Sequence, residues 1–140
     1  MKEIGKQAFE YSGLKTVTMG SGLTDIGEYA FRKCTSLYLI NLPDNILKIE
    51  TGCFEGCSAL ARITLPARMT NIGNSAFRDC TALKTVDIPI TLHGVDYYAF
   101  LGCSALKKIN YPGEPTYFAS IMINNGNDEL LLAYFGGIEE

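Results

Sequence analysis

Apolar residues recur along this chain with a period of 23 residues. Units of this length begin at Ile26, Ile49 and Ile72, and polar residues fill most positions between the apolar ones. In the first of these units the apolar or small residues are Ala30, Phe31, Cys34, Leu37, Ile40, Leu42 and Ile46. A fixed period of roughly 20 to 50 residues is typical of a solenoid, in which each unit forms one coil of a stack. The chain is therefore predicted to be a repeat protein.

Two less regular units flank these three, so that five units run from Ile4 to Pro112. The first unit lacks one residue between Ser12 and Leu14, and the last begins at Val95. A single coil cannot bury its own apolar side chains, so equivalent residues of successive coils are expected to stack in ladders. The two main predicted ladders contain Phe9, Phe31, Phe54, Phe77 and Phe100, and Leu14, Leu37, Leu60, Leu83 and Leu106.

Each unit is predicted to contain a helical part and a strand. Apolar residues fall four apart across residues 26–34, which fits one or two helical turns with one face inward. Across residues 37–42 the pattern changes to alternation, which indicates a short strand. Proline cannot donate a ladder hydrogen bond, and it follows this strand in four of the five units. These prolines are Pro43, Pro66, Pro89 and Pro112. Stacked units would place a parallel sheet on one face and short helical turns on the other.

The units resemble BspA-like leucine-rich repeats, whose pattern is approximately I-G-x-x-A-F-x-x-C-x-x-L-x-x-I-x-L-P-x-x-L. The resemblance covers residues 4–112. Glu50 and Asp96 stand where the pattern has glycine, and Ser12 stands where it has cysteine. Gly20 replaces the first proline, and none of these changes disturbs an apolar ladder. The resemblance implies an α/β fold, a right-handed leucine-rich-repeat solenoid, within a bacterial or protozoan surface protein that serves in adhesion or recognition.

The repeat fades after Pro112, and residues 113–140 are predicted to differ from the rest. Residues 117–123 and 128–135 suit two strands, and Asn125-Gly126 between them is a strong hairpin signal. Proteins that resemble this chain place a similar insert between repeat blocks. We expect a C-terminal β-hairpin cap in the same domain as the five-unit solenoid of residues 1–112. The tail at residues 136–140 is expected to fray.

Charge and hydropathy narrow the possible partners. Lys and Arg total 12 and Asp and Glu total 15, a net charge of −3, without the basic patch of a nucleic-acid-binding protein. No apolar stretch reaches the roughly 18 residues that span a bilayer, so no membrane insertion is predicted.

The chain opens at the last apolar position of a unit, which suggests a fragment of a longer protein, with self-association possible through an uncapped repeat end. The resemblance implies a location at the cell surface or outside the cell, with the cytoplasm as the alternative, and buried reduced cysteines fit either compartment.

Few side chains could carry chemistry. Four of the five cysteines share one repeat position, which favours a ladder of buried free thiols. Disulfides are less favoured because the Cβ vectors would point the same way, and zinc because a second pair of ligands is missing. The ladder cysteines are Cys34, Cys57, Cys80 and Cys103, and the fifth is Cys53. His93 falls at a polar position, away from any nucleophile. No catalytic residue, metal site or cofactor is predicted, and the chain is expected not to be an enzyme.

The outward face of the predicted sheet is the candidate binding surface, because solenoids often bind through such extended faces. The residues expected on it are Thr16, Thr18, Leu39, Asn41, Arg62, Thr64, Thr85, Asp87, Lys108 and Asn110. Its middle column is small and polar, and the nearest aromatic candidates are Tyr38, Tyr97 and Tyr98. We predict a module that binds a protein or a glycan of unknown identity. The alternative is a structural spacer in a larger surface protein, with no ligand of its own.

Overall fold

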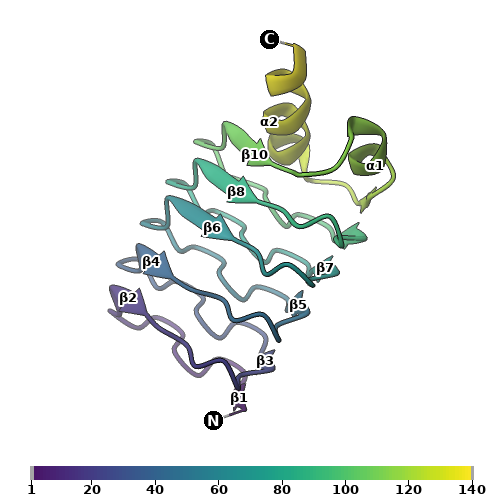
Figure 1. Ribbon diagram of the computed structural model, residues 1–140. Helices are drawn as coiled ribbons and strands as arrows, with labels where there is room; N and C mark the ends of the chain where they lie inside the picture. Colours follow the sequence, from purple (N-terminus) through teal and green to yellow (C-terminus); the bar gives the residue numbers. More distant parts are fainter. Residues whose placement is uncertain (1, 140) are drawn as a thin grey trace.

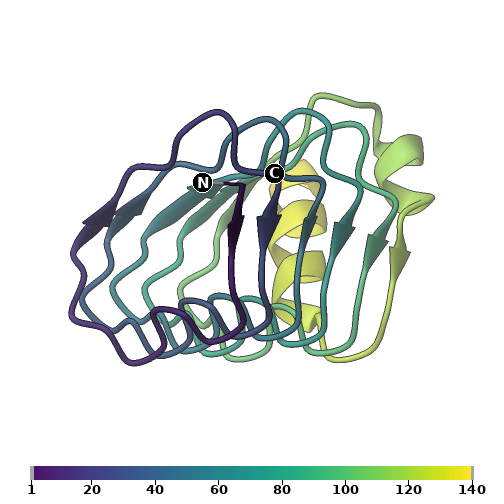
Figure 2. The same ribbon diagram turned by 90° about the horizontal axis from the view of Figure 1, so that it is seen from below.

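The computed structural model describes residues 2–139 as a stack of similar coils (Figure 1). Each coil contributes to two sets of short parallel strands, which we name the first and second ladders. The first ladder comprises β1 (Glu3–Ile4), β3 (Asp25–Ile26), β5 (Lys48–Ile49), β7 (Asn71–Ile72), β9 (Gly94–Val95) and β11 (Met122–Ile123). The second comprises β2 (Thr16–Val17), β4 (Leu39–Ile40), β6 (Arg62–Thr64), β8 (Thr85–Asp87) and β10 (Lys108–Asn110). Figure 2, which looks along the stack, shows the ladders on two sides of each coil.

Strand pairing in each ladder is interrupted between the second and third coils, and equivalent residues of neighbouring coils pair on either side of this break. Ile49 pairs with Ile72 in the first ladder, and Ile63 pairs with Val86 in the second. Both offsets equal the 23-residue period, so each coil adds one strand to each ladder. The predicted solenoid with a parallel sheet is confirmed.

Residues 26–34 and their equivalents form tandem turns, and the predicted helical turns were wrong. The backbone N–H of Ala30 donates to the Gly27 carbonyl at 3.2 Å, across a four-residue turn, and two further overlapping turns end at Arg32 and Cys34. Tyr29 and Lys33 have φ values of 58° and 59°, in the left-handed region, which a helix does not tolerate. Overlapping four-residue turns give apolar residues the same spacing of four that a helix gives them.

Hydrogen bonds from this turn edge join each coil to the next. The backbone N–H groups at three alternate positions point along the stack towards carbonyl groups of the following coil. Between the second and third coils the donor–acceptor pairs are Tyr29 to Thr51, Phe31 to Cys53 and Lys33 to Glu55, at 3.0, 2.9 and 2.7 Å. The left-handed residues therefore aim their N–H groups between coils, which continues the inter-coil bonding outside the strands.

The predicted side-chain ladders fill the interior. Phe31, Phe54, Phe77 and Phe100 are fully buried, and neighbouring rings stack with centroids 5.3 to 5.5 Å apart. Phe9, in the first coil, stacks on one side only and is 38% exposed. The core is therefore continuous along the stack and open at the N-terminal end.

The C-terminal part holds two helices and a strand, so the predicted β-hairpin was wrong. Helix α1 (Pro115–Ala119) leads into β11, and helix α2 (Asp128–Glu139) follows. Strand β11 pairs in parallel with β9 and begins a sixth coil. Gly126 has a φ of 86°, so the Asn125-Gly126 signal marks a left-handed position of that coil. Residues 136–139, predicted to fray, lie in α2, and Glu140 lies outside the described residues.

Helix α2 lies across the last coil (Figures 1 and 2). Leu130 of α2 is fully buried. The ring of Tyr134, also in α2, stacks on the ring of Phe118 in α1, with centroids 3.6 Å apart. The Glu129 carboxylate accepts a hydrogen bond from the Gly102 N–H at 3.0 Å. The C-terminal end of the core is thus covered by apolar side chains and tied to the stack by polar ones.

Candidate functional site

An open groove of about 790 Å³ runs over the second ladder, where β4, β6 and β8 end. Five of the residues predicted from the sequence line it, namely Leu39, Asn41, Arg62, Thr64 and Asp87. Asn110 borders a smaller adjoining hollow that shares Asp87 with the groove. The remaining predicted residues, Thr16, Thr18, Thr85 and Lys108, lie on strands or coil segments of the same ladder and not in the groove lining. The groove therefore covers only part of the predicted face.

The walls of the groove are apolar. Tyr38 and Leu39 of the second coil are 55% and 61% exposed, and Ile90 of the fourth coil is 55% exposed. Leu65 and Pro66 of the third coil are buried between them. A partner that covers this exposed apolar surface removes it from water, which favours binding by roughly 25 cal/mol for each Å² covered.

Asp87 forms the polar centre of the groove. Arg62 donates to both of its carboxylate oxygens, from Nε to Oδ2 at 3.0 Å and from Nη2 to Oδ1 at 3.1 Å. Thr64 Oγ1 donates to Oδ2 at 2.7 Å, and Asn110 Nδ2 donates to Oδ1 at 2.6 Å. The donors come from β6 and β10, on either side of β8, so Asp87 joins three coils.

This network also fixes the charge of Asp87. Partial burial alone would raise the pKa of its carboxyl group. The hydrogen bonds from Asn110, Thr64 and Arg62, together with the Arg62 charge, outweigh burial and lower the pKa below the ordinary value of 3.8. Asp87 is therefore ionised at neutral pH and stabilises the fold there, and this contribution is lost as the pH falls through the lowered pKa.

Asn41 ties coils together in a similar way. Its Oδ1 accepts from the Met19 N–H at 2.9 Å, and its Nδ2 donates to the Met19 carbonyl at 3.3 Å. The side chain thus pairs with a backbone segment of the first coil, just beyond the ends of β2 and β4. Four residues of the middle column of the predicted face therefore bond between coils, namely Asn41, Thr64, Asp87 and Asn110.

Sequence reasoning names Tyr38 only as an aromatic candidate and misses Ile90 altogether. The repeat position of Ile90 follows the proline and holds Asp44 and Ala67 in the two preceding units. A large apolar residue at a position that is otherwise polar or small was a usable signal. Both residues are walls of the groove, and their exposure distinguishes them from the buried apolar positions of the repeat.

A second hollow of about 430 Å³ lies over the first ladder, a surface that sequence reasoning assigns to helical turns. Glu50 and Asp96, which replace the glycine of the repeat, border it on either side of Gly73. Glu50 pairs with Lys48 at 3.1 Å, and Asp96 Oδ1 accepts from the Tyr97 N–H at 2.7 Å. Both carboxylates have partners on the protein, and Met122 is the large exposed apolar side chain that borders this hollow.

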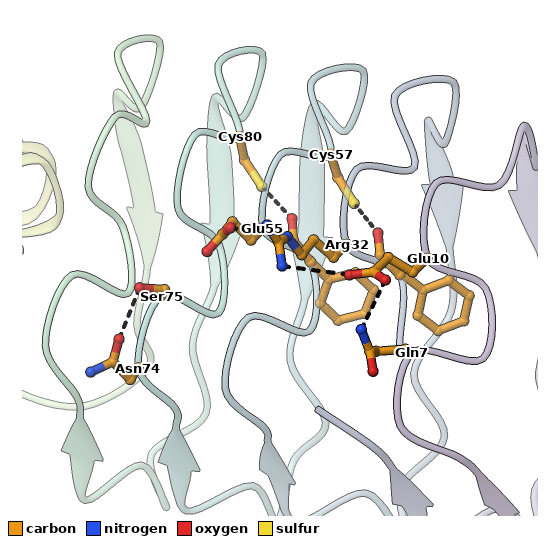
Figure 3. A network of polar contacts seen from close by, with 10 residues as sticks. Gln7, Glu10, Arg32, Glu55, Cys57, Asn74, Ser75 and Cys80 are labelled. Atoms are coloured by element: carbon orange, nitrogen blue, oxygen red, sulfur yellow. Dashed lines mark hydrogen bonds and ion pairs between the residues drawn. The ribbon is translucent and has the colours of Figure 1, made fainter. Parts of the chain in front are cut away.

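All five cysteines are buried and free, which confirms the predicted thiol ladder. The thiols of Cys57 and Cys80 donate to the carbonyls of Phe31 and Phe54 at 3.1 Å (Figure 3). Burial raises the pKa of Cys57 and of Cys103 to about 12, so these thiols stay protonated and are poor nucleophiles at neutral pH. Within residues 2–139, no three metal-ligating side chains gather into a group.

Charged residues alternate along the turn edge. Arg32 of the second coil lies between Glu10 of the first and Glu55 of the third, with N–O distances of 3.5 and 3.4 Å (Figure 3). Its guanidinium also lies 5.3 Å from the centre of the Tyr29 ring. The fourth coil places Arg78 at the same repeat position. Successive coils therefore carry acidic, basic, acidic and basic residues there.

A family model of the BspA type leucine rich repeat region matches residues 2–127 in six copies. The chain belongs to the BspA-type leucine-rich repeat family. The six copies agree with the sixth coil that begins at β11, beyond the residue 112 at which the sequence pattern fades. No curated protein matches the chain.

Several solved leucine-rich repeat structures are similar to this BspA-type chain. A leucine rich cell surface protein from Faecalibacterium prausnitzii is 30% identical, with a TM-score of 0.85 over 89% of this chain and 33% of its own. A leucine rich repeat protein from T. pallidum is 28% identical, with a TM-score of 0.67 over 78% of this chain and 62% of its own. One from Bacteroides ovatus is 30% identical, with a TM-score of 0.58 over 77% and 34%. The chain spans less than two thirds of the length of each of these proteins.

The helices of the described part are short. Helix α2 has 12 residues. Across residues 2–139, no helix combines the length and the hydropathy needed to cross a bilayer.

Proposed function

We propose that this chain is a non-enzymatic binding module of a cell-surface protein and that it takes a protein ligand in the groove over the second ladder. The exposed apolar walls formed by Tyr38, Leu39 and Ile90 are the observation that carries this proposal. The surface location draws support from the F. prausnitzii relative, which is described as a cell surface protein.

The chemistry of the groove favours a protein over a glycan. A sugar is held by side chains that offer hydrogen bonds to its hydroxyl groups. Here Arg62, Thr64 and Asn110 already donate to Asp87, so the polar centre has few groups left to offer. Apolar side chains of a protein would instead cover the exposed walls.

The spacing of the walls suits an extended segment. Leu39 belongs to the second coil and Ile90 to the fourth, which are two strand spacings or roughly 10 Å apart along the stack. Ile90 also lies five positions later in the repeat than Leu39, so the two walls are offset along the strand direction as well. An extended segment advances about 3.3 Å per residue, so one of roughly six residues can reach from one wall to the other. The ligand proposed is thus an extended segment with two apolar side chains, one against each wall.

Peptide display tests this proposal. A random peptide library would be panned on the chain and on the double variant Leu39→Asp, Ile90→Asp. Charges at both walls should abolish enrichment of the selected peptides by making the apolar contacts unfavourable. Leu47→Asp is the matched control, because Leu47 is an exposed leucine on the other side of the coil, bordering a different hollow.

Three outcomes would count against it. Peptides that bind the double variant as well as the unchanged chain would show that the groove is not the site. Binding on a glycan array that the same double variant abolishes would replace the protein ligand by a glycan. Enrichment of no peptide and no glycan would favour the spacer, in which the Asp87 network serves only to join coils.

A further inference from the structure

The two ends of the stack differ in their backbone hydrogen bonding. In the interior, three backbone carbonyls of each coil accept hydrogen bonds from N–H groups of the preceding coil. In the second coil these are the carbonyls of Glu28, Ala30 and Arg32. In the first coil the equivalent carbonyls are those of Lys6, Ala8 and Glu10. Among residues 2–139, no backbone or side-chain donor bonds to these three. The N-terminal end therefore presents three acceptors at alternate residues.

The C-terminal end has its donors occupied. The fifth coil aims three N–H groups along the stack, and the acceptors come from three different kinds of group. The pairs are Tyr98 N–H to the Asn125 carbonyl, Phe100 N–H to Asn127 Oδ1 and Gly102 N–H to Glu129 Oε2, each at 3.0 Å. Two side chains thus replace the carbonyls of a further coil, at the start of the helix that covers this end.

Apolar contact and charge at the N-terminal end point to the same kind of occupant. Phe9 stacks on Phe31 at 5.5 Å and leaves its other face uncovered. Ala8 is exposed, whereas its interior equivalent Ala30 is fully buried. Glu10 begins the alternating column, so the matching residue of a preceding coil would be basic.

We propose that the N-terminal end is a docking surface for one further coil of the same 23-residue repeat, with arginine or lysine six residues after its first-ladder isoleucine. Such a coil supplies three N–H donors in the required register, a phenylalanine for Phe9 and a cation for Glu10. A second copy of this chain does not fit. Its N-terminal end also presents acceptors, and its C-terminal donors are taken by Asn125, Asn127 and Glu129. The proposal does not depend on the groove.

A fused coil tests it. A copy of residues 26–45 placed directly before Met1 puts residues 1–3 in the register of residues 46–48 and brings the copied Arg32 next to Glu10. The amides of the copied Tyr29, Phe31 and Lys33 should exchange with solvent at least about 100-fold more slowly than in an unstructured peptide. The thermal unfolding midpoint should rise by several degrees above that of the unfused chain, because Phe9 becomes covered.

The matched control is the same fusion with Arg32→Glu in the copied unit only. It should unfold at a lower temperature than the arginine version, with the difference reduced by salt, because two glutamates then face each other. Three results would overturn the proposal: exchange in the copied unit as fast as in an unstructured peptide, equal midpoints for the two fusions, or a dimer of the unfused chain in light scattering that Phe9→Glu dissolves.

Discussion

The interior of the stack and the groove over the second ladder are made by the same coils but follow the repeat differently. In the interior, successive coils place the same or similar residues at a given position, and these residues make the same contact. Phenylalanine rings stack at 5.3 to 5.5 Å, and cysteine thiols donate to carbonyls at 3.1 Å, coil after coil. On the second ladder, over which the groove runs, one repeat position holds Leu39, Arg62 and Thr85 in successive coils.

This difference separates what builds the stack from what distinguishes this member of the family. Interior residues have equivalents above and below them, so each must match its neighbours in size and shape. The exposed wall residues of the groove, Tyr38, Leu39 and Ile90, face solvent and can vary without disturbing the stack. Substitutions in the interior should therefore change stability, and substitutions in the groove walls should change binding.

The largest effect is expected from Phe54→Ala. Phe54 is fully buried between Phe31 and Phe77, so the variant loses burial and leaves a cavity, at a cost of about 3 to 5 kcal/mol. Chemical denaturation measures this directly. Ile90→Ala is the groove counterpart and should change the free energy of unfolding by less than about 0.5 kcal/mol. Equal costs for the two variants would remove the distinction between interior and groove.

Alkaline pH should destabilise the stack through its thiols. Burial raises the pKa of Cys80 well above the ordinary value of 9.0 and that of Cys57 to about 12, so the unfolded chain releases these protons at a lower pH. A raised pKa gives stability that is present below pH 9 and lost above it, by about 1.4 kcal/mol per pH unit for each such thiol. Denaturation between pH 9 and 11 measures the slope. Cys80→Ala should make that slope shallower by one proton, and an unchanged slope would show that the thiols do not titrate on unfolding.

Asp87→Asn tests the polar centre of the groove. It removes the charge that Arg62 pairs with and should cost about 1 kcal/mol at neutral pH, because Arg62 itself is largely exposed to solvent. The lowered pKa of Asp87 means that the difference from the unchanged chain should shrink as the pH falls below 3.8. Urea titrations at neutral and acidic pH give both numbers. A difference that persists at low pH would assign the cost to shape and not to charge.

The smallest effect is expected at the turn edge. Ser75 has a φ of 57°, and the equivalent residue of the preceding coil is Gly52. Ser75→Gly relieves a left-handed non-glycine residue at the cost of chain entropy, so stability should rise by about 0.5 kcal/mol. Differential scanning calorimetry can resolve the shift in midpoint. A lower midpoint would mean that the Ser75 hydroxyl, which donates to Asn74 Oδ1 at 2.8 Å, outweighs the strain.

The apolar ladders could be predicted because the spacing of apolar residues depends only on which side chains face inward. The conformation of residues 26–34 could not be predicted, because overlapping four-residue turns and helical turns place apolar residues alike. The left-handed φ values that decide between them fall on Tyr29 and Lys33, residue types with no preference for that region. The first ladder could not be predicted either, because its two-residue strands are too short to show an alternating pattern.

At the C-terminus, the Asn125-Gly126 pair was interpreted as the turn of a β-hairpin, which the described residues do not contain. Asn125-Gly126 does require a left-handed glycine, but that glycine sits in a sixth coil whose strand, β11, pairs with β9. The hairpin signal concerns only strands on either side of a short turn, so it cannot indicate pairing between segments 28 residues apart. In the groove, the outward direction of Leu39 and Arg62 followed from alternation, whereas the groove itself depends on how Ile90 and Tyr38 approach it from different coils.

The most direct test of this account is to give the groove walls the residues of a neighbouring coil. Leu39→Arg and Ile90→Ala copy the residues that the third coil has at these repeat positions, Arg62 and Ala67. Binding of a peptide selected on the unchanged chain should fall at least about tenfold, with the unfolding midpoint unchanged within about 2 °C. Retained binding with the same midpoint would contradict the claim that departures from the repeat, and not the repeat itself, make the site.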